Sequence, residues 1–509
     1  MPFSEEYFRL FEDAPAFHDR VAQKYKLTSG GARVSERLLR CIWYDGLYDE
    51  KRLTAHDGKK IVVHSPGTWN LEGGPDFRRA EISIGDSRLK GDVELHIDPA
   101  GWRLHRHSQN PEYDGVILHV TLTKRAEEPP PASRHGVEIA EAALWDCLAD
   151  DLKMLRCALR PDEYPYRSTR NQGRCCGLLE EMPPETAQRL LCIAGDARII
   201  AKYRRFAYEA ENYDLDQVAY GAVLEGMGYK AHTKQFGRLA QKLLYGRLRE
   251  RVLSTAKADP AMGRACATQA LLLGAAALLP SPEDGDSPEA REYLRRLCKL
   301  WGEHGFKNLG GGDIAWKASA VRPANLPERR IAGVGHVLAR SFEGGLFAAI
   351  LARIMNDDAK QARTGSIEFL SAVTDEFWSY RYSARGKKLA KPVNLIGRDR
   401  ALTIVVNSFV PLGLLHAHRE SRSDAEERVH RFYCGLPSLP PNSVTRLMEY
   451  KMFGKSPKER VARTARTQQG LLQIFADWCS EDPSCEGCGI YAGLQSGYIR
   501  DRVMEAESV

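Results

Sequence analysis

The sequence predicts an α+β fold, with an N-terminal mixed-sheet domain followed by a large, mostly α-helical domain. From Leu53 to Lys124, apolar residues recur at every second position and turn residues separate the runs, as in β-strands. From Leu144 to about Ile350, apolar residues recur at helical spacing among good helix formers. The length of 509 residues is enough for about two to four domains, each with its own core.

The elements of the sheet domain are expected in close succession. Residues 1–30 form a helical lead-in, and a second helix begins at Ser35, a typical N-cap residue. The proline-containing segment 125–136 is a loop or linker, so the sheet domain spans residues 31–140. Its strands are expected at Lys60–His64, Ala80–Ile84, Leu89–Ile97 and Gly115–Thr123, with Gly85-Asp86-Ser87 as the turn between the second and the third.

The helical part is expected to consist of a domain at residues 141–425 and a C-terminal helical segment at 426–509 that carries a cysteine cluster. Its clearest helices are predicted by apolar residues three and four positions apart. They are Leu190–Arg205, Tyr213–Met227, Phe236–Leu253, Glu426–Cys434, Ser443–Met452 and Arg463–Asp477.

Composition excludes several classes of protein. With 43% hydrophobic and 28% charged residues, the chain is not broadly disordered, and a net charge of +6 excludes a wholly basic coat. No apolar run approaches the roughly 20 residues of a membrane-spanning helix, so no membrane partner is expected. The first 20 residues contain Glu5, Glu6, Glu12 and Asp13 and resemble neither a signal nor a transit peptide. We therefore expect a cytoplasmic protein.

The densest group of reactive residues lies between Gly73 and His119. Asp76 follows a turn, and Glu94 and His96 lie on the following strand, where alternate side chains project from the same face. Carboxylates at this spacing can hold a hard divalent cation such as Mg²⁺ or Mn²⁺. Such a cation lowers the pKa of bound water and offsets charge that develops on a phosphate.

This arrangement resembles the PD-(D/E)xK nuclease superfamily, whose fold is restriction-endonuclease-like. There an acidic residue opens one strand and an acid-x-Lys tripeptide lies on the next, which here correspond to Pro75-Asp76 and Glu94-Leu95-His96. The resemblance also implies an acid on the preceding helix, at Glu36. His96 departs from the pattern because it stands where the superfamily has lysine. A histidine can orient or deprotonate water, or bind a metal, but it carries no obligatory positive charge.

Two further histidines, His105 and His107, are separated by one residue close to this group. They can supply two nitrogen ligands to zinc, which makes a zinc hydrolase on His96, His105 and His107 a rival prediction. The simpler interpretation is that both are loop histidines. If they belong to a site, His107 is expected to touch a substrate phosphate rather than zinc.

A second metal site is predicted by the C-x5-C-x2-C pattern of Cys479, Cys485 and Cys488. Three thiolates this close in a reducing compartment suggest Zn²⁺ or a [4Fe–4S] cluster, and the residues fit both equally. A closed site needs a fourth ligand, for which Cys434 is the first choice and His430 the second. The adjacent pair Cys175-Cys176 is expected to be buried free thiols.

Two basic stretches are candidates for contact with a nucleic-acid backbone. Lys451–Arg466 contains six basic residues against the single Glu459, and Arg238–Arg251 is a second basic helical stretch. Such runs are more often solvated helix faces. The first stretch is favoured for binding because it lies directly before the cysteine cluster. Its expected contacts are Lys455, Lys458, Arg460 and Arg463.

Several segments together make the chain similar to a bacterial family catalogued as domain of unknown function 2851. The family supplies no assigned activity, but histidine at position 96 fits its pattern. The Arg322–Pro327 segment has no function from its residues alone. The segments that carry the resemblance are His64–Asn70, Gly74–Phe77, Gly91–His96, Arg322–Pro327 and Gln468–Leu471.

The residues and the resemblance together predict metal-dependent hydrolysis of phosphodiester bonds in DNA or RNA. Asp76 and Glu94 are expected to bind Mg²⁺ or Mn²⁺, Glu36 to complete the shell, and His96 to position or activate water. The alternative is a non-catalytic nucleic-acid-binding or scaffold protein that keeps the fold and a structural zinc or iron–sulfur site without the chemistry.

Overall fold

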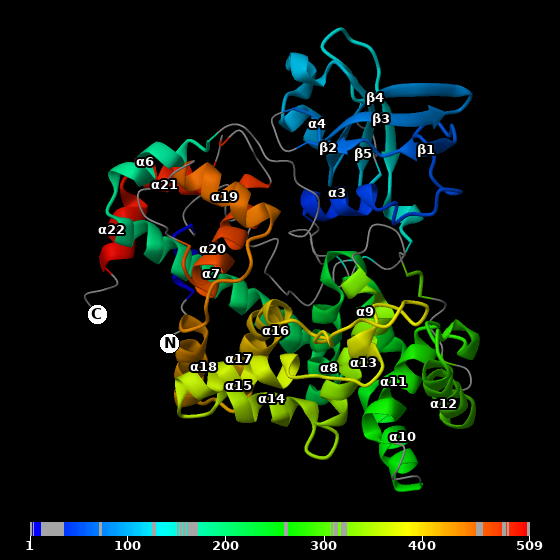
Figure 1. The fold of residues 1–509 in the computed structure, drawn as a ribbon. Coiled ribbons are helices and arrows are strands. Elements are labelled where there is room, and N and C mark those ends of the chain that lie inside the picture. Colours follow the sequence, from blue (N-terminus) through cyan, green and yellow to red (C-terminus); the bar gives the residue numbers. More distant parts are fainter. Residues whose placement is uncertain are drawn as a thin grey trace. The chain divides into compact units, whose positions relative to one another are not determined.

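The computed structural model describes residues 3, 5–11, 35–70, 74–124, 129–149, 152, 155, 159, 172–258, 263–306, 309, 314–316, 323–454, 462–480, 485 and 488–505 (Figure 1). The chain divides into two compact units. Unit 1 contains Met1–Ser4, Arg198–Pro440 and Arg463–Arg466. Unit 2 contains Glu5–Ala197, Pro441–Ala462 and Thr467–Val509, and is thus assembled from three separate stretches of chain.

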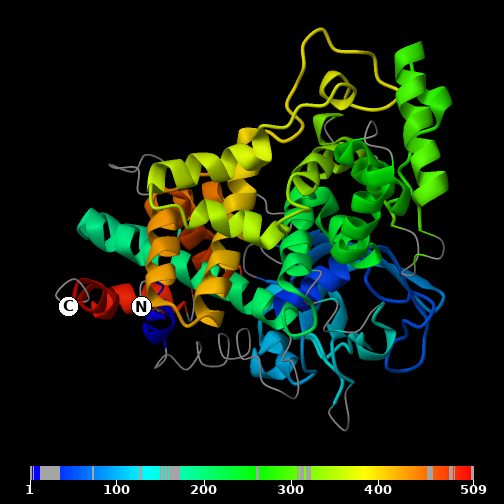
Figure 2. The same cartoon turned by 90° about the horizontal axis from the view of Figure 1, so that it is seen from below.

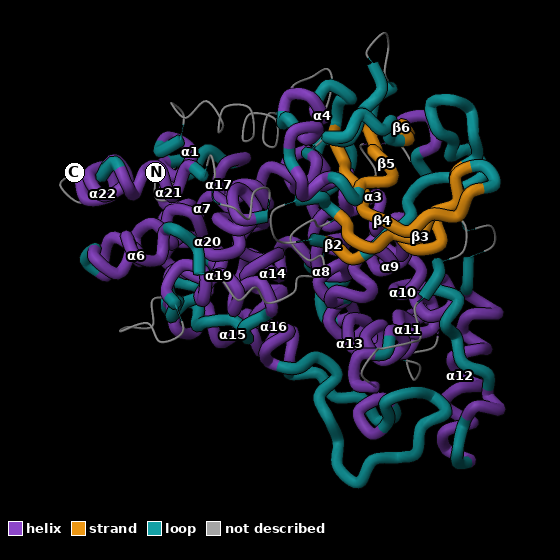
Figure 3. Tube along the Cα trace, turned by 90° about the horizontal axis from the view of Figure 1, so that it is seen from above, coloured by secondary structure: helices purple, strands orange, loops and turns teal. Residues whose placement is uncertain are grey.

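Unit 2 holds a mixed sheet, which confirms the predicted α+β fold. Its strand order is β1-β3-β4-β5-β6, with β2 paired to β3. β1, β3 and β4 are antiparallel neighbours, whereas β4–β5 and β5–β6 are parallel. The strands, orange in Figure 3, are β1 (Ile61–Ser65), β2 (Thr68–Trp69), β3 (Phe77–Ile84), β4 (Ser87–His96), β5 (Val116–Thr121) and β6 (Ala140–Ala143).

The change from antiparallel to parallel pairing places a crossover between β4 and β5, because parallel neighbours cannot be joined by a tight turn. The crossover, residues 97–115, contains helix α4 (Gly101–Leu104) and two 3-10 turns, His107–Gln109 and Pro111–Tyr113. Trp102 and Tyr113 from this segment form a small apolar cluster with Val116 and Ile139. The crossover thereby covers the end of β4 without a long helix.

Helix α3 (Glu36–Tyr44) packs against the other side of the sheet. The Ser35 side chain accepts a hydrogen bond from the Leu38 N–H, which confirms the predicted start of this helix. Leu39 and Trp43 of α3 join Val93 and Leu95 of β4 in one hydrophobic core. Because side chains alternate along a strand, residues 94 and 96 are directed to the opposite face, toward the crossover.

Two arginines of α3 connect the sheet with the C-terminal stretch of unit 2. The Arg37 guanidinium lies 5.5 Å from the Trp69 ring and 5.2 Å from the Phe475 ring, and the residue is only 2% exposed. Arg40 donates from Nη1 to the Ser480 carbonyl at 3.4 Å. Cation–π contact with two rings offsets part of the cost of burying this charge.

The remaining helices of unit 2 are short. At Gly470 an added Cβ would lie 2.0 Å from the Leu191 carbonyl oxygen, so only glycine allows the close packing of α20 against α7 there. The remaining helices of unit 2 are α1 (Glu6–Arg9), α6 (Cys175–Glu181), the first part of α7 (Pro184–Glu209), α19 (Ser443–Phe453), α20 (Ala465–Ile474), the π-helix Phe475–Cys479, α21 (Gly489–Gln495) and α22 (Tyr498–Glu505).

The described part of unit 1 is helical, and its helices pack side by side (green to orange in Figure 2). The continuous stretch Arg398–Arg419 is long and apolar enough to cross a membrane, but 78% of its apolar window is buried, as in a core helix. The helices are α8 (Leu215–Met227), α9 (Tyr229–Lys242), α10 (Tyr245–Ala258), α11 (Arg264–Ala275), α12 (Pro288–His304), α13 (Pro327–Ala339), α14 (Leu346–Ile354), α15 (Ala359–Ser371), α16 (Arg398–Ile404), α17 (Val410–Arg419) and α18 (Ser423–Cys434).

The element predictions are largely confirmed, with two corrections. The helix predicted at Phe236–Leu253 is wrong as a single element, because Leu243 adopts an extended backbone and separates α9 from α10. Strand β6 was not predicted, since Ala140–Ala143 has neither β-branched nor aromatic residues. Of the predicted lead-in, residues 12–30 lie outside the described residues, as do Arg322 of the Arg322–Pro327 segment and Cys157.

Candidate metal centre

Three imidazole nitrogens converge at the end of β4. His96 Nε2 lies 3.1 Å from His105 Nδ1 and 3.3 Å from His107 Nε2. All three nitrogens lie within 4.8 Å of one another. Ligands at about 2.1 Å from a tetrahedral zinc ion are themselves about 3.4 Å apart. The three side chains therefore fit a single bound metal ion.

A chain of hydrogen bonds fixes the tautomer of His96. His119 Nδ1 donates to the Glu141 carboxylate at 2.8 Å, which leaves His119 Nε2 as an acceptor. His96 Nδ1 donates to that acceptor at 2.9 Å. The lone pair of His96 is therefore on Nε2, the atom that faces His105 and His107. In many proteins a hydrogen-bond partner on the other ring nitrogen orients a metal-binding imidazole in this way.

The crossover positions the other two histidines by local backbone geometry. Arg106, between them, has a left-handed backbone with φ 56°, which turns His105 and His107 toward the same point. At Gly101 an added Cβ would lie 2.5 Å from the His96 ring, so the absence of a side chain lets α4 pack directly on that ring. The left-handed residue Arg106 and the close approach at Gly101 thus both belong to the crossover.

Aromatic side chains form the wall of the centre, and one side is open. The Tyr113 ring stacks on His107 with a centroid distance of 3.8 Å, and Trp102 contacts His107 at 5.3 Å. His96 is 1% and His107 6% exposed, whereas His105 is exposed. The centre is therefore shielded on the sheet side and accessible at His105. Three protein ligands with an accessible fourth position are typical of catalytic zinc sites.

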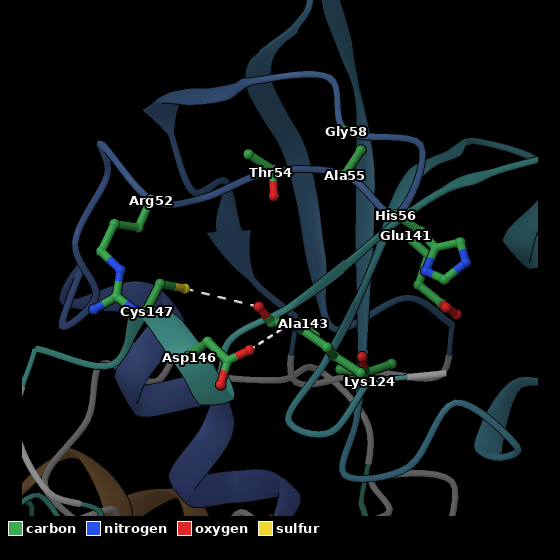
Figure 4. Close-up of a pocket in the computed structure, with 11 residues that line it drawn as sticks. Arg52, Thr54, Ala55, His56, Gly58, Lys124, Glu141, Ala143, Asp146 and Cys147 are labelled. Carbon is green, nitrogen blue, oxygen red and sulfur yellow. Dashed lines mark hydrogen bonds and ion pairs between the residues drawn. The ribbon is translucent and has the colours of Figure 1, made fainter. Parts of the chain in front are cut away.

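The hydrogen-bond chain ends at a pocket on the parallel side of the sheet. Glu141 lines this pocket, which has a volume of about 380 Å³, and its side chain lies beside His56 in Figure 4. Lys124 and Asp146, also in the wall, form an ion pair at 2.5 Å. Glu141 is itself only 6% exposed.

Two buried carboxylates, Asp76 and Glu94, lie near the histidines, and Asp76 is paired with Arg40. Asp76 Oδ1 is 2.7 Å from Arg40 Nε, and Asp76 Oδ2 accepts the Leu95 N–H at 2.9 Å. Glu94 Oε2 accepts the Asp76 N–H at 3.0 Å. The other oxygen, Oε1, lies 3.4 Å from His107 Nε2 and 3.7 Å from His96 Nε2. Glu94 alone of the pair thus reaches the histidine centre.

Burial favours the neutral form of each of these groups. It lowers the pKa of His107 to about 4 and holds the pKa of His96 well below its usual value, so both imidazoles are neutral at pH 7. It raises the pKa of Asp76 and of Glu94 to about 8, against the opposing effect of Arg40. A bound cation would favour the ionised carboxylate of Glu94.

The predicted acidic residues do come together, but around Arg40 rather than around a cation position. Glu36 Oε2 lies 3.9 Å from Arg40 Nη2, and Asp76 is paired with the same guanidinium. His105 and His107 lie on the crossover, and their ring nitrogens approach His96 Nε2 to 3.1 and 3.3 Å, as the rival zinc prediction requires. His119 and Glu141 orient His96 through hydrogen bonds, and no sequence spacing predicts that they lie next to it.

The predicted basic contacts and cysteine ligands do not all lie in one unit, and some are outside the described residues. Lys455, Lys458 and Arg460 lie outside the described residues, and Arg463 is exposed in unit 1. Cys434 also lies in unit 1, where its sulfur is 3.6 Å from His430 Nε2 and 3.4 Å from Arg466 Nη1. Cys479, Cys485 and Cys488 belong to unit 2, so neither choice of fourth ligand falls in their unit.

One comparison with known proteins gives a match. A family model described as a protein of unknown function (DUF2851) matches residues 36–439, which include α3, the sheet, the crossover and most of unit 1. No curated protein and no solved structure matches the chain.

Proposed function

Since this chain belongs to the DUF2851 family of proteins of unknown function, we propose that it is a metal-dependent hydrolase that cleaves phosphodiester bonds in nucleic acid. The observation that carries the proposal is the convergence of His96, His105 and His107 on one point at the separations of metal ligands. A bound divalent ion would lower the pKa of a coordinated water and stabilise charge on the phosphate.

The donor set favours zinc over magnesium. Imidazole nitrogens suit Zn²⁺, whereas Mg²⁺ prefers carboxylate, carbonyl and water oxygens. Glu94 is the nearest carboxylate, and it is not part of the group whose ligand atoms lie within 4.8 Å of one another. We therefore assign the three histidines to the ion, and treat manganese as the second ion to be tested.

Glu94 is placed to accept a proton from water at the open position. Its Oε1 lies 3.4 Å from His107 Nε2, while Oε2 is held by the Asp76 N–H, so the carboxylate cannot rotate freely. With a pKa of about 8, Glu94 is mostly protonated at pH 7 in the metal-free protein, and a bound cation would lower this pKa so that the ionised carboxylate can act as a general base. Asp76 is expected to orient Arg40 and the Glu94 carboxylate rather than to bind the ion.

Two features support nucleic acid as the substrate class. The element order places Asp76 just before β3 and Glu94-Leu95-His96 at the end of the adjacent β4, as the likeness to PD-(D/E)xK nucleases requires. Arg103 and Arg106 are exposed on the same crossover as His105, where cationic side chains can contact phosphates.

The proposal is tested with metal-free protein titrated with Zn²⁺ and Mn²⁺. Metal affinity is measured by calorimetry, and hydrolysis is followed on fluorescent single- and double-stranded DNA and RNA. His107→Ala is expected to lose metal and activity together. Glu94→Gln is expected to keep metal affinity and fold but to lose turnover by roughly 10²–10⁴-fold, the usual contribution of a general base.

Matched variants control for general effects of the substitutions. His64→Ala removes an exposed histidine that bonds to Ser83, and Glu81→Gln removes a carboxylate paired with Arg88, both away from the centre. Both are expected to behave as the parent protein. Full turnover in Glu94→Gln would overturn the proposed role of this carboxylate. Metal-independent nucleic-acid binding without hydrolysis would instead identify a binding or scaffold protein.

A further inference from the structure

The three clustered cysteines of the C-terminal stretch meet a fourth cysteine from a distant part of the sequence. Cys175 is the first residue of α6, and α6 packs against α19 and α21. Cys488 is the residue directly before α21, and Cys479 ends the π-helix that follows α20. Figure 1 shows α6, α19 and α21 grouped together within unit 2.

Contacts on either side of each cysteine hold these segments together. The Gly173 N–H donates to the Lys451 carbonyl of α19 at 2.9 Å, and the Arg174 guanidinium lies 5.9 Å from the Tyr491 ring of α21. At Gly489 an added Cβ would lie 2.4 Å from the Trp478 ring, so Cys488 is held close to the turn that carries Cys479. Residues 173–175, 478–479 and 488–491 therefore meet at one place.

The electrostatics of the thiols agree with this placement. The pKa of Cys175 rises to about 12, mainly through burial and further through Cys488 and Cys485. The pKa of Cys479 also rises, through burial, Cys488, Cys175 and Cys485 in turn, while Lys451 opposes the rise. Cys488 and Cys485 thus act on both thiols, and Cys175 also acts on Cys479, as expected for thiols that lie near one another.

The backbone between the cysteines is also specialised. Cys485 has a left-handed backbone with φ 65°, a conformation that non-glycine residues seldom adopt outside turns. Such strain persists when surrounding structure requires it.

We propose that Cys175, Cys479, Cys485 and Cys488 bind an iron–sulfur cluster, with Cys175 as the fourth ligand. The inference does not depend on the hydrolytic function proposed above. The set joins the first stretch of unit 2 to its last, across roughly 300 residues of chain that include most of unit 1.

The spacing of the sulfurs favours a cluster over a single zinc ion. Four thiolates at about 2.3 Å from one zinc ion lie about 3.8 Å apart. Among the described residues, the histidine centre is the group whose ligand atoms all lie within 4.8 Å of one another, so no three of these four sulfurs come that close. In a [4Fe–4S] cluster each cysteine binds a different iron atom, and the sulfurs are spread more widely.

The test begins with full-length protein purified without oxygen. About four iron atoms and four sulfides per chain are expected, with a broad visible absorption that dithionite bleaches. Cys175→Ala is expected to lose most of the iron and the absorption. Two matched variants should keep both: Cys176→Ala, whose thiol bonds instead to Glu180 at 3.7 Å, and Cys434→Ala in unit 1.

Several results would overturn the inference. One zinc ion per chain without iron or sulfide would exclude the cluster, and iron loss in Cys434→Ala but not in Cys175→Ala would exclude the fourth ligand. If Cys175→Ala does not fold, Cys175→Ser replaces it, because serine is nearly isosteric. A change in the electron paramagnetic resonance of reduced Cys175→Ser supports direct ligation, and an unchanged spectrum contradicts it.

Discussion

At the scale of single residues, the histidine at position 96 changes the chemistry of the acidic site. A lysine there would bring a permanent positive charge beside Arg40, whereas a neutral imidazole brings a lone pair. The lone pair faces His105 and His107 because His119 and Glu141 hold the opposite ring nitrogen. One difference from the nuclease pattern therefore places a nitrogen donor, in place of a positive charge, beside the two carboxylates.

This hydrogen-bond chain leads to a prediction for Glu141→Gln. An amide can donate to His119 as well as accept from it, so the tautomer of His96 is no longer fixed. We expect zinc affinity to fall by about 10–100-fold with the fold retained, the usual effect of removing a group that orients a metal ligand. Calorimetry against Glu138→Gln, an exposed glutamate just before β6, provides the comparison. Equal affinity in the two variants would show that the chain does not orient His96.

The raised carboxylate pKa values lead to a prediction of pH dependence in metal-free protein. Glu94 has a pKa of about 8 in the folded state and an ordinary value of 4.5. Between these values the folded state binds more protons than the unfolded state, so its contribution to the unfolding free energy decreases as pH rises from 4.5 to 8. The difference in unfolding free energy between the parent and Glu94→Gln should decline over this range. A constant difference would contradict the shift.

The sequence predicted part of this site and missed the rest for physical reasons. Strand alternation was enough to place Glu94 and His96 on one face, next to Asp76. The arrival of His105 and His107 depends on the left-handed backbone at Arg106 and on the stacking of Tyr113, which no local pattern specifies. Cys175 and Cys176 are buried free thiols as predicted, but the packing of α6 against the C-terminal stretch could not be predicted because the two lie roughly 300 residues apart in sequence.

At the scale of elements, the crossover between β4 and β5 both closes the sheet and builds the centre. Parallel pairing requires a long connection, and this one consists of short turns instead of a full helix. The short turns keep His105 and His107 within reach of His96. Gly101 is the point of closest approach, where the backbone of α4 meets the imidazole ring.

Gly101→Ala tests this packing. The added methyl group overlaps the His96 ring at 2.5 Å, so either α4 or the ring must move. We expect a loss of about 1–3 kcal/mol in the unfolding free energy, together with weaker zinc binding. Gly221→Ala in α8, where an added Cβ meets nothing within 4 Å, should be neutral or stabilising. Unchanged metal binding in Gly101→Ala would show that the ring tolerates displacement.

Individual elements differed in how well they could be predicted. α3 and β4 were found because capping and alternation are strong local signals. β6 has only alanines and one glutamate, and it forms through pairing with β5 rather than through propensity. The break at Leu243 leaves good helix formers on both sides, so its extended backbone reflects tertiary packing.

At the scale of the whole molecule, unit 2 depends on residues from both ends of the described chain. Arg37 and Arg40 of α3 contact Phe475 and Ser480, and α6 packs on α19 and α21. A division read along the sequence places these stretches in separate segments, because composition carries no information about which distant segments meet. The contacts themselves assign them to one unit.

A chain that ends at Arg466 tests this dependence. Without Phe475 and Ser480, α3 loses its C-terminal contacts, and we expect its amide hydrogens to exchange faster. Helix α13 of unit 1 makes its contacts with other helices of that unit and should keep its protection. Hydrogen exchange followed by mass spectrometry reports both regions in one experiment. The reverse pattern would contradict the assignment of the C-terminal stretch to unit 2.

The three-stretch construction of unit 2 also has a consequence for how each molecule is made. A ribosome adds about 5–20 residues per second, and Phe475 emerges about 440 residues after Arg37, roughly 20–90 s later. Throughout that interval α3 and the sheet exist without their last partners, while the helices of unit 1 are produced in between. The surroundings of α3 are completed late in the synthesis of each chain, at a time that translation sets rather than the folding rate of the sheet.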